Sequence, residues 1–253
     1  YRERIALGRS VCPAILEAID HDLENTVFSF IPNTAEVACY GMLKAMDDEF
    51  DRVKERRILE LGAGVDPTKL RAILALRPRL EKVAIKDAKL RTFITADDAR
   101  DDLVAHVYDI TYGTVKPGVD NLVVIDDSIV RGTTLRQSIL KMLARLEPKR
   151  IVVVSSAPQI RYPDCYGIDM AKMGDLVAFR AAIALLKETR QENVIDDVYD
   201  RALAMVGRPL VEQENVVKEI YRPFSAERIS VKIGELLTPP NLDVEVKIVF
   251  QSI

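Results

Sequence analysis

Residues 123–134 read Val-Val-Ile-Asp-Asp-Ser-Ile-Val-Arg-Gly-Thr-Thr, and this stretch decides the fold. It begins in a continuous apolar run at 122–125, which is typical of a strand covered on both faces in a parallel sheet. A helical pattern follows from about Thr133 to Leu146, and another apolar run lies at 151–154. Strand, helix and strand with short connections form a βαβ unit, so the sequence predicts an α/β fold around a mostly parallel sheet flanked by helices.

The same stretch carries the residues of a candidate ligand site. Asp126 and Asp127 follow the strand directly, at the carboxyl end where open α/β sheets bind ligands. Gly132 allows the backbone to approach a ligand closely, and the start of the helix favours a phosphate. Carboxylates repel a phosphate unless they face hydroxyls or a metal ion, so a ribose phosphate is the simplest ligand. Ordinary turn chemistry with a helix cap is the competing interpretation, and it accounts for an Asp-Asp pair better than for the whole string.

Periodicity predicts further elements on both sides of this unit. Strands are expected at 27–31, 83–85 and 244–250, and helices over 36–57 and from Asp66-Pro67 to about Leu76. A regular apolar face at 195–206 predicts a helix, and such a face is more often core packing than a partner site.

Composition excludes several classes of protein. The 253 residues are 48% hydrophobic, which is enough for one large domain or a core domain with an appendage. A net charge of −3 without a basic block argues against nucleic acid as a partner. No apolar run is long enough to span a membrane, and three scattered cysteines give neither a disulfide framework nor a zinc site. A cytoplasmic protein is therefore expected.

The string at 123–134 resembles the 5-phosphoribosyl 1-pyrophosphate (PRPP) motif of type I phosphoribosyltransferases, in the form found in the amidophosphoribosyltransferase family. Residues 155–170, Ser-Ser-Ala-Pro-Gln-Ile-Arg-Tyr-Pro-Asp-Cys-Tyr-Gly-Ile-Asp-Met, resemble a second segment of that family. Residues 31–35 resemble its pyrophosphate loop, and Lys86 with 91–94 resembles the flexible loop that folds over PRPP. The resemblance implies a type I phosphoribosyltransferase-like fold, and the helical pattern beyond Met170 predicts a helical C-terminal extension.

The resemblance also implies roles for individual residues. Asp126, Asp127 and Arg91 are the expected catalytic residues, and Asp126 and Asp127 with Thr34 are expected to hold Mg²⁺. Thr34, Lys86 and Arg91 are expected to meet the pyrophosphate. The remaining substrate-binding residues cradle the 5-phosphate, and they are Ser128, Ile129, Val130, Arg131, Gly132, Thr133 and Thr134.

The implied reaction is phosphoribosyl transfer from PRPP to ammonia, which gives 5-phosphoribosylamine and pyrophosphate in the first step of de novo purine biosynthesis. Such a glycosyltransferase receives ammonia from a glutaminase domain, and here that domain is expected upstream of Tyr1. Cys12 is expected in the core rather than as a nucleophile, so this chain alone is not expected to hydrolyse glutamine. Homo-oligomers and inhibition by purine nucleotides are family expectations, whereas three cysteines supply no iron–sulfur cluster.

The expected domains are a phosphoribosyltransferase domain at 1–180, with an insertion at about 43–82, and an extension at 181–253. Four aspartates at 97–102 stand where the family is usually basic, which leaves an inactive homologue open. Two competing functions are a phosphoribosyltransferase for a nucleobase and a non-catalytic PRPP-binding regulator. The 155–170 resemblance argues against the first, and the acidic chain without a helix-turn-helix argues against a DNA-binding form of the second.

Overall fold

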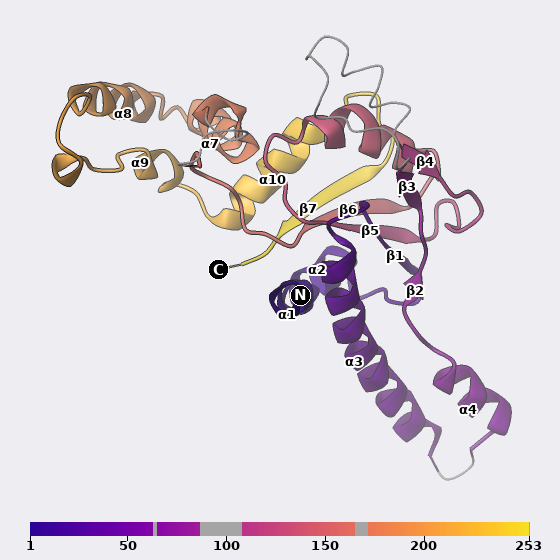
Figure 1. The fold of residues 1–253 in the computed structure, drawn as a ribbon. Helices are drawn as coiled ribbons and strands as arrows, with labels where there is room; N and C mark the ends of the chain where they lie inside the picture. Colours follow the sequence, from indigo (N-terminus) through magenta and orange to yellow (C-terminus); the bar gives the residue numbers. More distant parts are fainter. Residues whose placement is uncertain (63–64, 87–107, 165–171, 253) are drawn as a thin grey trace. The chain divides into compact units, whose positions relative to one another are not determined.

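The computed structural model describes residues 1–62, 65–86, 108–164 and 172–252 (Figure 1). The chain forms two compact units. The first comprises 1–128, 133–158 and 238–253, and the second comprises 129–132 and 159–237. The expected domain boundary at residue 180 remains a prediction.

The first unit is built on a parallel sheet, which confirms the predicted fold class. Among the described residues its strands lie in the order β2-β1-β5-β6-β7, and every neighbouring pair is parallel. Their bounds are β1 (Thr26–Phe30), β2 (Arg79–Leu80), β5 (Asn121–Asp126), β6 (Arg150–Ser155) and β7 (Glu245–Phe250). A separate antiparallel pair joins β3 (Ala84–Lys86) to β4 (Tyr108–Ile110).

The apolar runs form strands because both faces of the sheet are covered. Every residue of β1 and β6 is buried, and in β5 only the last residue, Asp126, is partly exposed. Val123 lies between Phe28 of β1 and Val152 of β6, and all three belong to the main apolar core. Cys12 and Cys39 lie in the same core, which confirms the prediction for Cys12. The helices in this part of the first unit are α1 (Arg2–Ser10), α2 (Cys12–Ala18), α3 (Glu36–Leu61) and α4 (Pro67–Leu74).

The far end of α3 and the following α4 form a helical hairpin that extends away from the sheet (Figure 1). The last buried residue of α3 is Phe50, and α4 has no buried residue. Asp66 caps α4 by accepting the Thr68 N–H at 2.8 Å, as its Asp-Pro start predicts. This hairpin lies within the expected insertion at 43–82.

The helix after β5 confirms the predicted βαβ unit. The backbone is helical from Thr133 to Ala144, with a π-helical turn at Leu135–Ile139 followed by α6 (Leu140–Ala144). It ends two residues before the predicted Leu146, ahead of Pro148. The helix supplies the crossover connection that the parallel neighbours β5 and β6 require.

The second unit is helical in its described residues. Its apolar face at 195–206 was expected in the core, and this prediction is wrong for half of the face. Val198 is buried, but Tyr199 and Leu203 are exposed because the described residues place nothing over them. The elements are η4 (Met173–Asp175), α7 (Val177–Glu188), α8 (Asn193–Ala204), η5 (Leu210–Glu212), α9 (Lys218–Tyr221) and α10 (Ala226–Leu237). In the described part of the chain, no helix is both long and apolar enough to cross a membrane.

Candidate functional site

The carboxyl ends of β1, β5 and β6 meet at one edge of the sheet. Phe30 pairs with Ile125, and Asp126 pairs with Ser155. The Ile31 N–H donates to the Ile125 carbonyl at 2.9 Å and continues the pairing into the turn after β1. Three connections therefore leave this edge side by side: the turn at 31–35, the acidic pair and the serines after β6.

The acidic pair consists of Asp126 and Asp127, and backbone N–H groups of the same segment donate hydrogen bonds to both carboxylates. An Asp126 carboxylate oxygen accepts the Asp127 N–H, and an Asp127 carboxylate oxygen accepts the Ser128 N–H, both at 2.8 Å. Both side chains are half-buried. Burial, and then the negative charge of Asp127, raise the pKa of Asp126 to about 7. Within the described residues no lysine or arginine forms an ion pair with either carboxylate, so a bound cation would relieve this repulsion.

Ser156, the first residue after β6, forms two hydrogen bonds to the backbone of the acidic pair. Its N–H donates to the Asp126 carbonyl at 3.0 Å, and its hydroxyl donates to the Asp127 carbonyl at 3.2 Å. The neighbouring Ser155 hydroxyl donates to the Ala157 carbonyl at 2.8 Å. Sequence reasoning did not place Ser156 in the site. The available signal was a pair of hydroxyls at the end of the strand that follows the acidic pair, Ser155 within the strand and Ser156 directly after it.

Thr34 lies on the same edge, in the turn that follows β1. The side chain is exposed, and the Thr34 carbonyl accepts a hydrogen bond from the Arg4 guanidinium at 3.3 Å. The peptide bond between Pro32 and Asn33 is cis. The structure therefore brings Thr34, Asp126 and Asp127 to one edge of the first unit, where the resemblance expects them.

The residues predicted to cradle the phosphate divide between the two units. In the first, Thr133 and Thr134 are exposed where the helix begins, and Ser128 is half-buried. In the second, the Val130 carbonyl accepts the Val177 N–H at 2.8 Å at the start of α7. Ile129 is buried, so it has a packing role there.

Gly132 occupies a position that favours glycine. Its φ of +72° lies in the left-handed region. A Cβ atom here would lie 2.4 Å from the Leu237 side chain. The neighbouring Arg131 is anchored through its carbonyl, which accepts from Arg180 at 2.6 Å, and its guanidinium lies 3.7 Å from the Asp175 carboxylate.

Several predicted residues lie outside the described part of the chain. Arg91, the acidic stretch at 97–102 and residues 165–170 all fall there. Lys86 is the last residue of β3, and only its backbone is described. Their predicted roles therefore remain predictions.

Magnesium is compatible with the donors that the structure brings together. The described residues contain no group of three or more His, Cys, Asp or Glu side chains that could hold a metal ion by themselves. Mg²⁺ usually binds through one or two carboxylates together with water and substrate phosphates. The pair formed by Asp126 and Asp127 fits that mode, in which substrate completes the coordination.

These features define a class of protein: an open parallel α/β sheet whose carboxyl edge presents a carboxylate pair beside a hydroxyl-rich loop that enters a helix. No family model matches the chain. A stretch of 59 residues is 49% identical to the amidophosphoribosyltransferase of Pasteurella multocida (strain Pm70), and it covers 23% of this chain and 12% of that protein. A stretch of 58 residues is 47% identical to the amidophosphoribosyltransferase of Escherichia coli (strain K12), over 23% of this chain and 11% of that protein.

The curated relatives confirm the resemblance to amidophosphoribosyltransferases over these stretches. The matches span only about an eighth of the relatives' own length. A solved structure of glutamine PRPP amidotransferase from B. subtilis, complexed with ADP and GMP, aligns with 95% of this chain and 39% of its own, at a TM-score of 0.44 and 22% identity.

Proposed function

We propose that this chain carries the phosphoribosyl-transfer site of an amidophosphoribosyltransferase, a glycosyltransferase that uses PRPP. The observation that carries the proposal is the carboxylate pair Asp126 and Asp127 at the end of the central strand, on the edge shared with Thr34. The reaction is PRPP plus ammonia giving 5-phosphoribosylamine and pyrophosphate, at the start of purine biosynthesis. The 49% identity of a 59-residue stretch to a named amidophosphoribosyltransferase supports it.

The proposed chemistry is a displacement at C1 of the ribose. The lone pair of the ammonia nitrogen forms the C1–N bond while the C1–O bond breaks. The electron pair of the broken C1–O bond leaves with the pyrophosphate oxygen. The nitrogen then releases a proton to solvent. Positive charge builds on the ribose during this exchange, and the carboxylates of Asp126 and Asp127 stabilise it while accepting hydrogen bonds from the ribose hydroxyls.

The 5-phosphate is proposed to bind where the helix begins at Thr133, because backbone N–H groups and the helix dipole favour an anion there. Thr34, Lys86 and Arg91 are assigned to the pyrophosphate. Asp126 and Asp127, with Thr34, would hold Mg²⁺, which when bound neutralises charge on the leaving group. Closing the site against water suppresses hydrolysis of PRPP.

Ammonia is proposed to come from a glutaminase domain in another part of the complete protein. Purine nucleotides are proposed inhibitors. Both proposals rest on the family resemblance.

Pyrophosphate release from PRPP with Mg²⁺ tests the assignment. The assay compares no acceptor, ammonium at alkaline pH, glutamine and a panel of nucleobases. Release that depends on ammonium and is unaffected by glutamine supports the proposal. Release only with a nucleobase would replace it with a salvage-type phosphoribosyltransferase, and PRPP binding without any release would replace it with a regulator.

Substitution of the carboxylate pair tests whether the measured pyrophosphate release depends on this site. The double substitution Asp126→Asn with Asp127→Asn removes both charges and keeps the side-chain volume, so ammonium-dependent release should fall by about a thousandfold or more. Asp243→Asn is the matched control, because Asp243 is exposed and precedes β7, at the opposite edge of the sheet. Normal turnover in the double variant would refute the site.

A further inference from the structure

The second unit exposes a run of apolar side chains on α8 and the residues after it. Tyr199, Leu203 and Val206 are spaced by four and three residues, which places them on one face of the helix and of the turn that follows it. They are 66%, 58% and 77% exposed, and Val211 beyond them is 93% exposed. Exposed apolar groups gathered in this way are typical of an interaction site. The first three residues, which span about two helical turns, are called the α8 ridge below.

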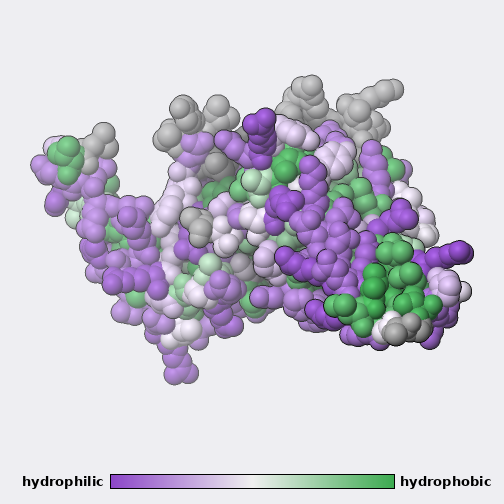
Figure 2. All heavy atoms as spheres, turned by 90° about the horizontal axis from the view of Figure 1, so that it is seen from below, coloured by the Kyte–Doolittle hydropathy of each residue, from purple (hydrophilic) through white to green (hydrophobic). Residues whose placement is uncertain are grey.

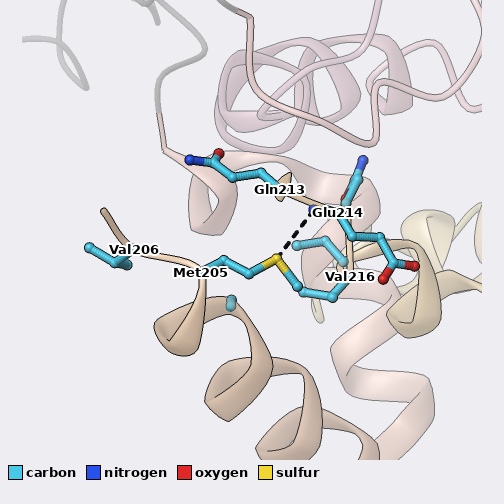
Figure 3. A pocket seen from close by; sticks show the side chains of 8 residues that line it. Met205, Val206, Gln213, Glu214 and Val216 are labelled. Carbon is cyan, nitrogen blue, oxygen red and sulfur yellow. Dashed lines mark hydrogen bonds between the residues drawn. The ribbon is translucent and has the colours of Figure 1, made fainter. Parts of the chain in front are cut away.

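A hollow lies beside the α8 ridge. It is lined by Ala202, Met205 and Val206 on one side and by 213–217 on the other, and its volume is about 220 Å³ (Figure 3). The Met205 sulfur accepts the Glu214 N–H at 3.3 Å, and a methionine side chain adapts its shape to different apolar groups. Pockets for small-molecule ligands usually measure about 300–1,000 Å³. The hollow therefore suits one apolar side chain of a partner better than a whole small molecule.

The segment that carries the α8 ridge is acidic. Residues 192–214 contain six acidic and two basic side chains, which gives a net charge of −4. Arg201 pairs with Asp197 at 3.2 Å and lies 4.0 Å from Glu214, and the second basic residue, Arg208, is exposed. The other four carboxylates are exposed and form no ion pair within the described residues: Glu192, Asp196, Asp200 and Glu212.

Two of these carboxylates lie directly beside the α8 ridge. Asp196 precedes Tyr199 by three residues, and Asp200 likewise precedes Leu203, and residues three apart on a helix are surface neighbours. A partner that covers the α8 ridge therefore comes within reach of both carboxylates, and positive charge next to its own apolar groups would favour it. An anionic membrane surface or a second α8 ridge would instead bring like charges together.

The tip of the α3–α4 hairpin also exposes apolar side chains, but without a comparable charge bias. Figure 2 shows apolar side chains gathered at this tip, where Leu59 is largely exposed. Three basic side chains of the hairpin pair with acidic neighbours outside 52–77: Arg52, Lys54 and Arg57. The remaining charged side chains of 52–77 are four basic and three acidic. Charge therefore selects a partner chemistry on α8 and selects none on the hairpin.

We propose that the α8 ridge is a docking site for an amphipathic helix of a partner protein, one whose apolar face is flanked by lysine and arginine. Apolar side chains of the partner cover the α8 ridge, and one of them fills the hollow beside Met205. The basic flanks pair with Asp196 and Asp200. Apolar residues at i, i+3 or i+4 and i+7 of the partner match a ridge of about two turns.

A display library of randomised helical peptides tests the proposal without assuming a partner sequence. The full chain is the bait, and the variant with Leu203→Ser and Val206→Ser serves for counter-selection. Peptides that bind only the wild type should carry apolar residues at helical spacing with lysine or arginine beside them. Both substituted side chains are exposed, so the variant should fold, and circular dichroism with a thermal melt checks that it does.

Fluorescence anisotropy with an enriched peptide then measures the contribution of charge. Asp196→Lys with Asp200→Lys should raise the dissociation constant by about tenfold or more. Glu55→Lys with Glu60→Lys is the matched control, because it changes the net charge equally at exposed positions of the first unit. The control should change the dissociation constant by about twofold or less, and about 0.5 M NaCl should weaken binding to the wild type. A peptide whose basic residues are replaced by glutamate should bind the Asp196→Lys, Asp200→Lys variant again.

Three outcomes would overturn the proposal. These are a selection that enriches no peptide specific for the wild type, enriched peptides that lack basic residues, and binding that the α8 reversal and its control change equally. None of the substituted positions belongs to the proposed PRPP site, so ammonium-dependent pyrophosphate release should be the same in every variant. Failure of the docking site therefore leaves the proposed reaction standing.

Discussion

The carboxyl edge of the sheet and the α3–α4 hairpin belong to the same compact unit, yet their side chains are held very differently. At the edge, fully buried strands end in turns that hydrogen bonds fix, such as the bond from Ser156 to the Asp127 carbonyl. On the hairpin, α4 has no buried residue and Leu59 is 81% exposed. The edge has the rigidity that positioning a substrate requires, while the hairpin has apolar surface that folding of this unit does not use.

A matched pair of leucine truncations gives the largest expected difference between the two regions. Leu122 is fully buried in β5, so Leu122→Ala should lower the free energy of unfolding by about 2–5 kcal/mol. Leu59→Ala should change it by about 0.5 kcal/mol or less, because that side chain is already in water. Urea unfolding measures both. Equal losses would show that the hairpin leucine is packed.

A glycine pair separates backbone conformation from crowding. Gly132 and Gly118 both have positive φ, so alanine at either position should lower the free energy of unfolding by about 1–2 kcal/mol. Only Gly132→Ala adds a clash, with Leu237, which should bring a further loss of about 1–3 kcal/mol. Thermal melts of the two variants check this, and identical losses would contradict the close approach to α10.

The serine after β6 tests how the edge is held together. Ser156→Ala removes the hydroxyl that donates to the Asp127 carbonyl, so stability should fall by about 1 kcal/mol and Mg²⁺-dependent PRPP binding should weaken. Ser10→Ala removes a comparable but exposed bond to the Leu7 carbonyl and should leave binding unchanged. Unchanged binding in both variants would remove Ser156 from the site.

Stability is also expected to depend on pH through Asp126. Its pKa is raised to about 7 in the folded chain, against about 4 when unfolded, so the folded state binds the extra proton between those values. The stability from this group is full below about pH 4 and is lost as pH rises towards 7. Unfolding in EDTA should show a steeper decline over that range for the wild type than for Asp126→Asn. Parallel curves would mean that the carboxyl is not perturbed.

The sequence predicted the central βαβ unit because its strands are covered on both faces, which leaves unbroken apolar runs such as Ile151 to Val154. The short strands β2 and β4 were not predicted, because they show no period and no apolar run and depend on their pairing partners. The equally short β3 was predicted from its apolar run at 83–85. The apolar pattern at 195–206 predicted the amphipathic helix α8. Such a pattern does not show whether another element covers Leu203.

Within the site, the acidic pair and Thr34 were predicted through motif and resemblance, and the sheet brings them to one edge. Ser156 was missed because its role depends on a register that places β6 beside β5. Arg91 and the side chain of Lys86 lie outside the described residues, so their roles rest on the resemblance.

Calorimetric titration of PRPP into the chain tests the central claim most directly, with Mg²⁺ present and then with EDTA. The wild type and Asp243→Asn should bind PRPP in a Mg²⁺-dependent way, and the variant with both Asp126→Asn and Asp127→Asn should lose that dependence. Equal binding by all three proteins, or no binding by the wild type, would contradict a PRPP site at the carboxyl edge of the sheet.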